Sequence, residues 1–157
     1  MQTEFSVFVS HSMRPADLPL LRGVCEHLSH YGITYYLAER DWRFGEHLPA
    51  RIENAIKRSH CVLGFLTQDG EASAWVNQEI GAAIAAKKPV LPVLEMGTNL
   101  TGFRSGLDYI ELDRHAPQDC ATKLSARLNQ LDASKDVRSA ICWAVIATAG
   151  LIFLGRD

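Results

Sequence analysis

The sequence predicts an α/β protein built on a doubly wound, flavodoxin-like sheet of five parallel strands. Short apolar runs alternate along the chain with longer segments of helical periodicity, which is the pattern of parallel strands joined by crossover helices. The 157 residues, 47% of them hydrophobic and 22% charged, suffice for one folded domain with a sizeable core. An uncharged segment follows this domain near the C-terminus and predicts an additional apolar helix.

The first half of the chain supplies two strands and two helices. Residues 5–10 form a compact β-prone run, and residues 16–30 place leucines and a valine on one helical face. Residues 33–37 form the second strand. A polar, glycine-containing loop spans residues 38–48, and Pro49 is suited to start a helix that ends near Ser59.

The second half continues the alternation. Residues 61–66 are an apolar run that predicts a buried strand, and a helix extends from an N-cap at Ser73 to residue 87 or 88. Residues 89–94 and 109–112 predict the fourth and fifth strands. Residues 119–131 predict a last amphipathic helix, so the folded domain is expected over residues 1–132.

Residues 133–157 are expected to form a hinge and the apolar C-terminal helix. The stretch from Ser139 to Leu154 contains no charge and is flanked by Arg138 and Arg156. As a helix it would be about 24 Å long, short of a hydrocarbon core of about 30 Å. We favour a membrane anchor for a cytoplasmic domain, because the segment is apolar on all sides. A buried helix or an oligomer contact are the alternatives.

Composition excludes several classes of protein. The 16 basic and 18 acidic side chains give a net charge of −2, which provides no basis for nucleic-acid binding. The cysteines show no spacing suited to zinc, and we expect no metal site. They are interpreted as buried thiols in a reducing compartment; they are Cys25, Cys61, Cys120 and Cys142.

Four segments are expected to meet at the carboxyl edge of the sheet, where doubly wound proteins bind ligands. Ser10-His11-Ser12 follow the first strand, residues 38–45 the second and residues 67–69 the third. The helix that carries Trp75 and Glu79 begins beside the last of these. The two side chains are four residues apart and therefore share one helical face. The simpler alternative is a half-exposed tryptophan beside a solvated glutamate.

Common chemistries of doubly wound proteins do not fit this edge. A phosphoryl-accepting domain needs acidic residues after the first strand, and Ser10-His11-Ser12 stand there instead. Neither G-x-G-x-x-G nor G-x-S-x-G is present. A single carboxylate suffices, however, to cleave a glycosidic bond whose leaving group departs neutral, as nicotinamide does from NAD⁺. Glu79 could stabilise the oxocarbenium-like ribose, and Trp75 could stack on the cationic ring.

Several motifs together resemble a Toll/interleukin-1 receptor (TIR) domain over about residues 4–131. They are residues 5–12, the Gly45-Glu46 loop with residues 52–59, Ser73-x-Trp75-Val76-x-x-Glu79-Ile80, and residues 89–93. The Trp-x-x-x-Glu spacing resembles the bacterial, NAD⁺-cleaving branch of the family. That resemblance implies that Glu79 is catalytic, that Trp75 stacks on the substrate and that Ser10, His11 and Ser12 line its pocket.

The resemblance also implies an activity and partners. NAD⁺ is the substrate and no cofactor is needed; the products are nicotinamide and ADP-ribose or a cyclic isomer, formed when domains self-associate, in antiphage defence. Glu39 and Gly45 are assigned to the substrate site, and Trp42, Arg43 and Phe44 to an assembly loop within residues 38–48. His11 and Glu39 replace an aspartate or arginine of many relatives, which leaves affinity and product type open. The alternative function is a non-catalytic scaffold that signals by homotypic assembly.

Overall fold

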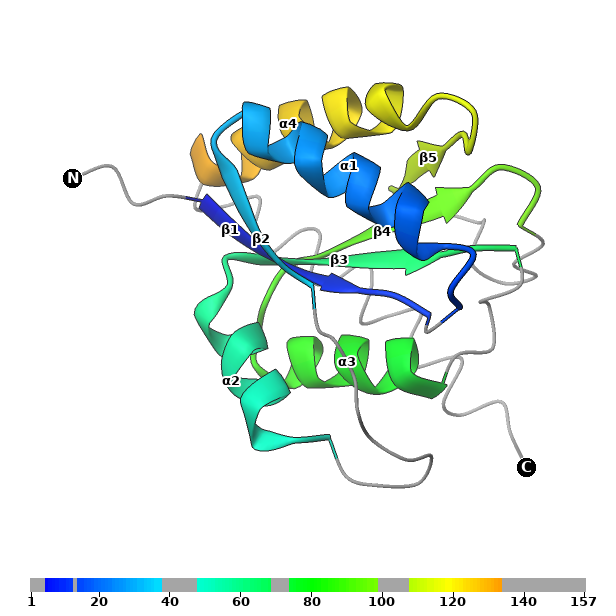
Figure 1. Ribbon diagram of the computed structural model, residues 1–157. Helices are drawn as coiled ribbons and strands as arrows, with labels where there is room; N and C mark the ends of the chain where they lie inside the picture. The colour runs from blue at the N-terminus through cyan, green and yellow to red at the C-terminus, as the bar shows by residue number, and fades with distance from the viewer. Residues whose placement is uncertain (1–4, 13, 38–47, 69–73, 99–107, 134–157) are drawn as a thin grey trace.

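The computed structural model describes residues 5–12, 14–37, 48–68, 74–98 and 108–133. These residues contain five strands and four helices, which alternate except that the last two strands follow one another in the element order (Figure 1). The elements are β1 (Phe5–Ser10), α1 (Leu18–His30), β2 (Ile33–Leu37), α2 (Ala50–Arg58), β3 (Cys61–Leu66), α3 (Ala74–Ala85), β4 (Val90–Glu95), β5 (Ile110–Leu112) and α4 (Pro117–Ala133). Every strand and helix expected within the described residues is present, with ends that differ by a few residues.

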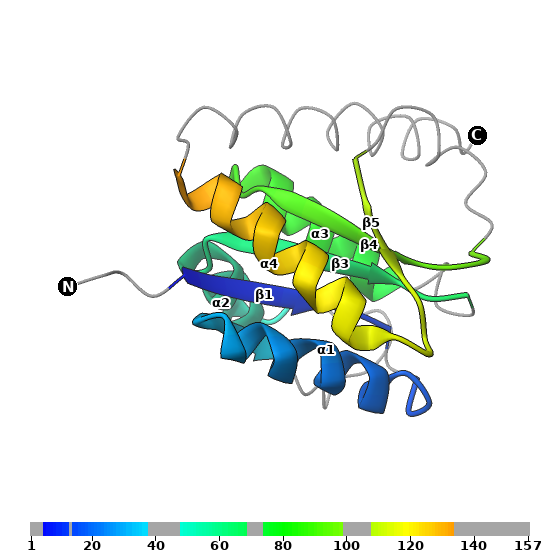
Figure 2. The same ribbon diagram turned by 90° about the horizontal axis from the view of Figure 1, so that it is seen from above.

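The strands form one parallel sheet in the order β2-β1-β3-β4-β5, which confirms the doubly wound prediction. Helices α1 and α4 cover one face and α2 and α3 cover the other, as Figures 1 and 2 show from two directions. The chain passes outward from β1 to β2 and then returns to β3 on the other side of β1. The switch point therefore lies between the carboxyl ends of β1 and β3.

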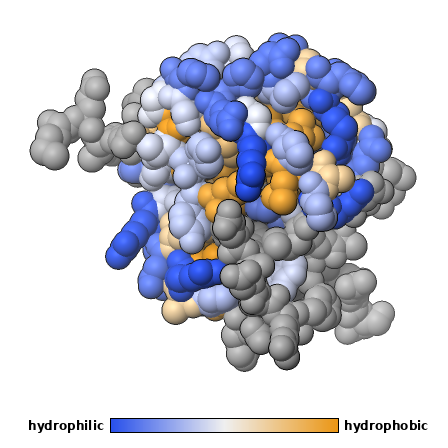
Figure 3. Space-filling model, viewed as in Figure 1, coloured by the Kyte–Doolittle hydropathy of each residue, from blue (hydrophilic) through white to orange (hydrophobic). Residues whose placement is uncertain are grey.

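Two apolar layers hold the helices on the sheet. On β1, Val7 and Val9 belong to the cluster under α1 and α4, whereas Phe8 belongs to the cluster under α2 and α3. Because side chains alternate between the faces of a strand, Ser6 and Ser10 lie on the Phe8 side. Charged and polar side chains cover much of the face seen in Figure 3, and apolar groups appear between the helices.

Helix ends are where the structure departs from the sequence pattern. Helix α1 begins at Leu18 rather than at residue 16, with Asp17 at the N-cap position and a proline in its first turn. Helix α4 begins at Pro117, two residues before the expected start, because proline fits a first helical turn. The expected N-cap, Ser73, lies outside the described residues, as do residues 134–157 with their predicted apolar helix.

The burial predicted for the cysteines is confirmed for the described part of the chain. Cys25, Cys61 and Cys120 are buried free thiols, and Cys142 lies outside that part. Burial raises the pKa of both Cys25 and Cys120 to about 12, which makes these thiols unreactive. None of the described helices is long and apolar enough to span a bilayer.

Candidate active site

Ser10 and Glu79 are joined at the carboxyl end of β1. The Ser10 hydroxyl donates a hydrogen bond of 2.6 Å to Oε2 of Glu79, across 69 residues of sequence. Both residues are fully buried. A carboxylate removed from water is costly unless hydrogen bonds satisfy it, and a bond from a hydroxyl to a charged acceptor is among the stronger ones. The structure therefore holds Glu79 at the switch point, on the side of the sheet that α3 covers.

A glycine in β3 lets α3 approach closely enough to make this bond. Gly64 is the register partner of Ser10, and a Cβ atom built on it would lie 3.3 Å from Cδ1 of Ile80. Ile80 directly follows Glu79, so the close packing of one residue positions the other. Val76 and Ala83 are buried on the same helix, so α3 packs on the sheet through this apolar face.

Trp75 lies one helical turn before Glu79 and is half-buried. The four-residue spacing places both side chains on one face of α3, as expected. The simpler alternative from the sequence, a solvated glutamate, is wrong because Glu79 has no exposed surface. Stacking of Trp75 on a substrate stays a prediction.

The two residues after β1 turn toward the other side of the sheet edge. His11 and Ser12 are buried, and Nδ1 of His11 donates a 2.6 Å hydrogen bond to the carbonyl oxygen of Ser12. A carbonyl can only accept, so Nδ1 carries the proton. The Ser12 hydroxyl donates to Asp17 at 3.2 Å. The Ser10-His11-Ser12 segment thus connects Glu79 on one face of the sheet to Asp17 on the other.

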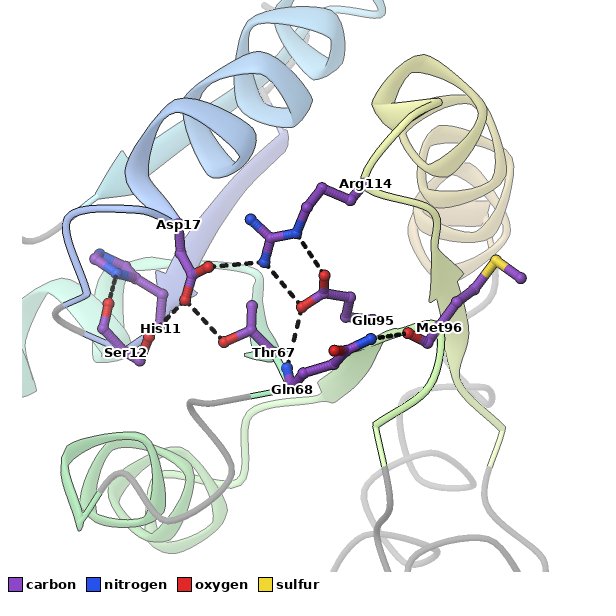
Figure 4. A network of polar contacts seen from close by, with 8 residues as sticks. All are labelled: His11, Ser12, Asp17, Thr67, Gln68, Glu95, Met96 and Arg114. Atoms are coloured by element: carbon purple, nitrogen blue, oxygen red, sulfur yellow. Dashed lines mark hydrogen bonds and ion pairs between the residues drawn. The ribbon is translucent and has the colours of Figure 1, made fainter.

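Asp17 is the centre of a polar network that the sequence did not reveal (Figure 4). Its carboxylate accepts hydrogen bonds from Ser12, from the Thr67 hydroxyl at 2.9 Å and from Nη2 of Arg114 at 2.8 Å. Arg114 also donates to Glu95, from Nε at 2.6 Å and from Nη2 at 3.0 Å. Elements α1, β3, β4 and the segment before α4 are tied together at the carboxyl edge.

The network keeps both of its acids ionised. Burial acts to raise the pKa of Asp17, but hydrogen bonds from Arg114, Thr67 and Ser12 outweigh it, so this pKa is lowered. The hydrogen bond from Arg114 lowers the pKa of Glu95, and the backbone N–H of Gln68 adds to that effect. The pKa of Arg114 is raised by the same two carboxylates.

The only local signal for this network was Asp17 itself. Aspartate just before a helix normally caps it with its side chain. Here Asp17 occupies the N-cap position but makes no side-chain cap hydrogen bond, because its carboxylate is directed to Arg114 and Thr67. Nothing in the local sequence around Glu95 or Arg114 indicated a partner so distant in the chain.

Several expected site residues lie outside the described residues. They are Glu39, Trp42, Arg43, Phe44 and Gly45. Of the four segments expected to converge, the structure brings together Ser10–Ser12, Thr67 and Glu79. Two cavities lined by described residues lie along α2, and neither includes Glu79. In the described ranges no three His, Cys, Asp or Glu side chains are grouped to hold a metal ion.

Comparisons with solved structures support the fold. The chain is similar to the TIR domains of the activated Roq1 resistosome that directly recognises the pathogen effector XopQ, at 18% identity and a TM-score of 0.54 over 93% of this chain and 84% of that one. It is also similar to the Clostridium botulinum CMP N-glycosidase BcmB, at 20% identity and a TM-score of 0.54 over 78% of this chain and 98% of that one.

The sequence itself identifies the family. No curated protein matches it. The model of the TIR domain family matches residues 7–128, which is well over half of the chain and contains every strand and helix from β2 to β5. The match also contains Ser10 and Glu79, so the buried pair lies within the matched domain. The chain therefore belongs to the TIR domain family.

Proposed function

We propose that this protein cleaves the bond between nicotinamide and ribose in NAD⁺, releasing nicotinamide and ADP-ribose or a cyclic isomer. One observation carries the proposal: a fully buried carboxylate, Glu79, is held by Ser10 at the switch point of the sheet. This edge is where doubly wound folds bind their ligands.

The chemistry needs few groups. Nicotinamide leaves as a neutral molecule, so no general acid is required, and the barrier lies in forming an oxocarbenium-like ribose. A negative charge fixed beside that ribose stabilises it most when water is excluded. Ser10 holds one oxygen of Glu79 and so fixes the plane of the carboxylate. Trp75 then stacks on the cationic ring before it departs.

We also propose that cleavage is activated when copies of this domain associate. Glu79 has no exposed surface in the single chain, so a substrate reaches its carboxylate only after neighbouring segments shift. Contacts between domains are a source of free energy for such a shift. The resistosome to which the fold is similar is itself an assembly of TIR domains. The loop of Trp42, Arg43 and Phe44 is assigned to these contacts.

The likeness to a CMP N-glycosidase supports the reaction class but suggests another substrate. NAD⁺ and CMP both carry a ribose joined to a nitrogen of a ring. We favour NAD⁺ because its nicotinamide leaves without protonation, whereas cytosine departs as an anion unless an acid assists. Glu79 supplies charge stabilisation without such an acid.

The decisive experiment follows nicotinamide release by chromatography. The purified protein is incubated with NAD⁺ under crowding conditions that promote assembly, beside a Glu79→Gln variant. Glutamine keeps the size of the side chain and still accepts from Ser10, so this variant should fold and lose turnover. Equal turnover in both proteins contradicts a catalytic role for Glu79. Release of cytosine from CMP with no cleavage of NAD⁺ contradicts the substrate assignment.

A non-catalytic scaffold is the second candidate, favoured by the complete burial of Glu79. It predicts that Glu79→Gln keeps cellular activity while Trp42→Ala or Phe44→Ala abolishes it. We also propose a cytoplasmic antiphage role with residues 139–154 as a membrane anchor. Cell fractionation tests the anchor: recovery of the whole intact protein in the soluble fraction contradicts it.

A further inference from the structure

A cavity lies on the α2 side of the sheet, toward the opposite end of β1 from Glu79. Its volume is about 440 Å³, and its lining includes Ser6, Tyr36, Arg51, Asn54, Ala55 and Arg58. Ser6 and Ser10 share one face of β1 with the buried Phe8 between them, and four residues of strand span about 13 Å. The cavity is therefore separate from the candidate active site, and the proposed mechanism uses none of its residues.

Helix α2 forms a basic wall of this cavity. Arg51, Asn54, Ala55 and Arg58 recur at the spacing i, i+3, i+4 and i+7, which places all four on one helical face. The two guanidinium groups thus stand two turns apart along the cavity. Within the described ranges no carboxylate forms an ion pair with Arg58, whereas its neighbour Lys57 pairs with Glu53 at 3.9 Å. Strongly hydrophilic side chains are visible over α2 at the lower left of Figure 3.

The opposite wall is aromatic and is held in place. Tyr36 comes from the edge strand β2, is 40% exposed and stacks on Phe8 with ring centroids 5.7 Å apart. Ser6 is fixed by His60, whose Nδ1 accepts the backbone N–H of Ser6 at 3.0 Å and lies 2.9 Å from its hydroxyl oxygen. Two guanidinium groups therefore line one wall of the cavity, and a phenol ring and a positioned hydroxyl line the other.

We propose that this cavity binds a small phosphomonoester that carries a flat ring, of the size of a nucleoside monophosphate. Guanidinium groups match the geometry of phosphate oxygens, and the Asn54 amide adds a donor. The Ser6 hydroxyl donates to Nδ1 of His60, so its oxygen is left to accept a hydrogen bond from the base. The Tyr36 ring and Ala55 provide apolar surface for a base. The volume falls within the range of small-molecule sites and exceeds what a bare phosphate fills.

AMP is the probe for the test, with the full chain and its Arg58→Gln and Lys57→Gln variants. Affinity is measured by calorimetry, and the bound region is located by amide NMR shifts. We expect shifts along α2, β1 and β2, and a loss of affinity of about tenfold or more in Arg58→Gln, the size expected for a hydrogen bond to a charged group. Lys57→Gln removes the same charge from the adjacent position outside this cavity and should bind AMP as the wild type does.

Two further probes separate the parts of the ligand. Adenosine and inorganic phosphate should each bind more weakly than AMP, because adenosine lacks the phosphate and inorganic phosphate lacks the ring. The proposal is overturned if AMP fails to bind at about 10 mM, if both variants lose affinity equally, or if the shifts are confined to α3. These measurements need no turnover, so their outcome is independent of whether the protein cleaves NAD⁺.

Discussion

Arg114 and Asp17 are 97 residues apart in the chain, yet their guanidinium and carboxylate groups lie 2.8 Å apart. Asp17 is fully buried, and the same guanidinium also holds Glu95. This one side chain therefore ties the segment after β1 to the ends of β3 and β4. The candidate active site is built on that edge, so its geometry depends on a residue that takes no part in the chemistry.

Replacing Arg114 should destabilise the fold. Arg114→Met leaves the buried Asp17 without its cationic partner, and we expect a loss of about 2 kcal/mol in the free energy of unfolding, since Arg114 is partly exposed. Urea denaturation measures it. Arg127→Met is the matched control, because Arg127 pairs with the exposed Asp108 and should cost less than about 1 kcal/mol. Equal losses in the two variants would refute a special role for the network.

The same network predicts a pH dependence of stability. Asp17 and Glu95 have a lower pKa in the folded state, so the unfolded state binds more protons as the pH falls. The contribution of these two acids to stability is complete above their unfolded pKa values of about 4. It is lost as the pH falls below those values, toward the lower pKa values of the folded state. Urea midpoints measured from pH 7 down to about pH 3 should fall more steeply for the wild type than for Arg114→Met. Parallel pH curves would show that this guanidinium does not set the two pKa values.

The Ser10→Ala variant tests whether catalysis needs Glu79 to be positioned by Ser10 or needs only its charge. The variant keeps Glu79 but removes its 2.6 Å hydrogen bond. We expect turnover of NAD⁺ to fall about tenfold to a hundredfold through kcat, with a cost in stability of about 1–3 kcal/mol because a buried acceptor loses its donor. Ser10→Thr, which retains the hydroxyl, should recover part of the activity. Steady-state kinetics checks both, and an unchanged kcat in Ser10→Ala would contradict the positioning role.

The packing of α3 can be tested with a pair of glycines. Gly64→Val places two methyl groups where a Cβ atom already meets Ile80 at 3.3 Å, so α3 should shift away from β3. We expect a stability loss of about 1–3 kcal/mol and a larger loss of turnover, because Glu79 moves with the helix. Gly81→Ala is the control: its Cβ meets nothing within 4 Å, and helix propensity predicts a gain of about 1 kcal/mol. Thermal unfolding and nicotinamide release distinguish the two variants. Full activity in Gly64→Val would show that the close approach is not needed.

The strands and helices could be predicted because the sequence patterns that indicate them are local. Apolar runs such as Cys61–Leu66 and helical periodicity such as that of α1 are contained within a few turns of chain. Once strands and helices alternate, handedness rules leave few topologies, and the carboxyl ends of β1 and β3 must meet. The meeting of the segment after β1 with the helix that carries Glu79 follows from that topology and was predicted from the sequence, whereas the hydrogen bond between Ser10 and Glu79 was not.

Only the tertiary structure decided which charged groups meet. An aspartate before a helix looks the same in the sequence whether it caps that helix or binds an arginine almost a hundred residues later, and Asp17 does the latter. Likewise, the sequence allowed Glu79 to be solvated, and its complete burial depends on how closely α3 packs over Gly64. Sequence patterns determine elements because their periodicity is local, whereas hydrogen bonds between distant side chains depend on the distances that folding creates.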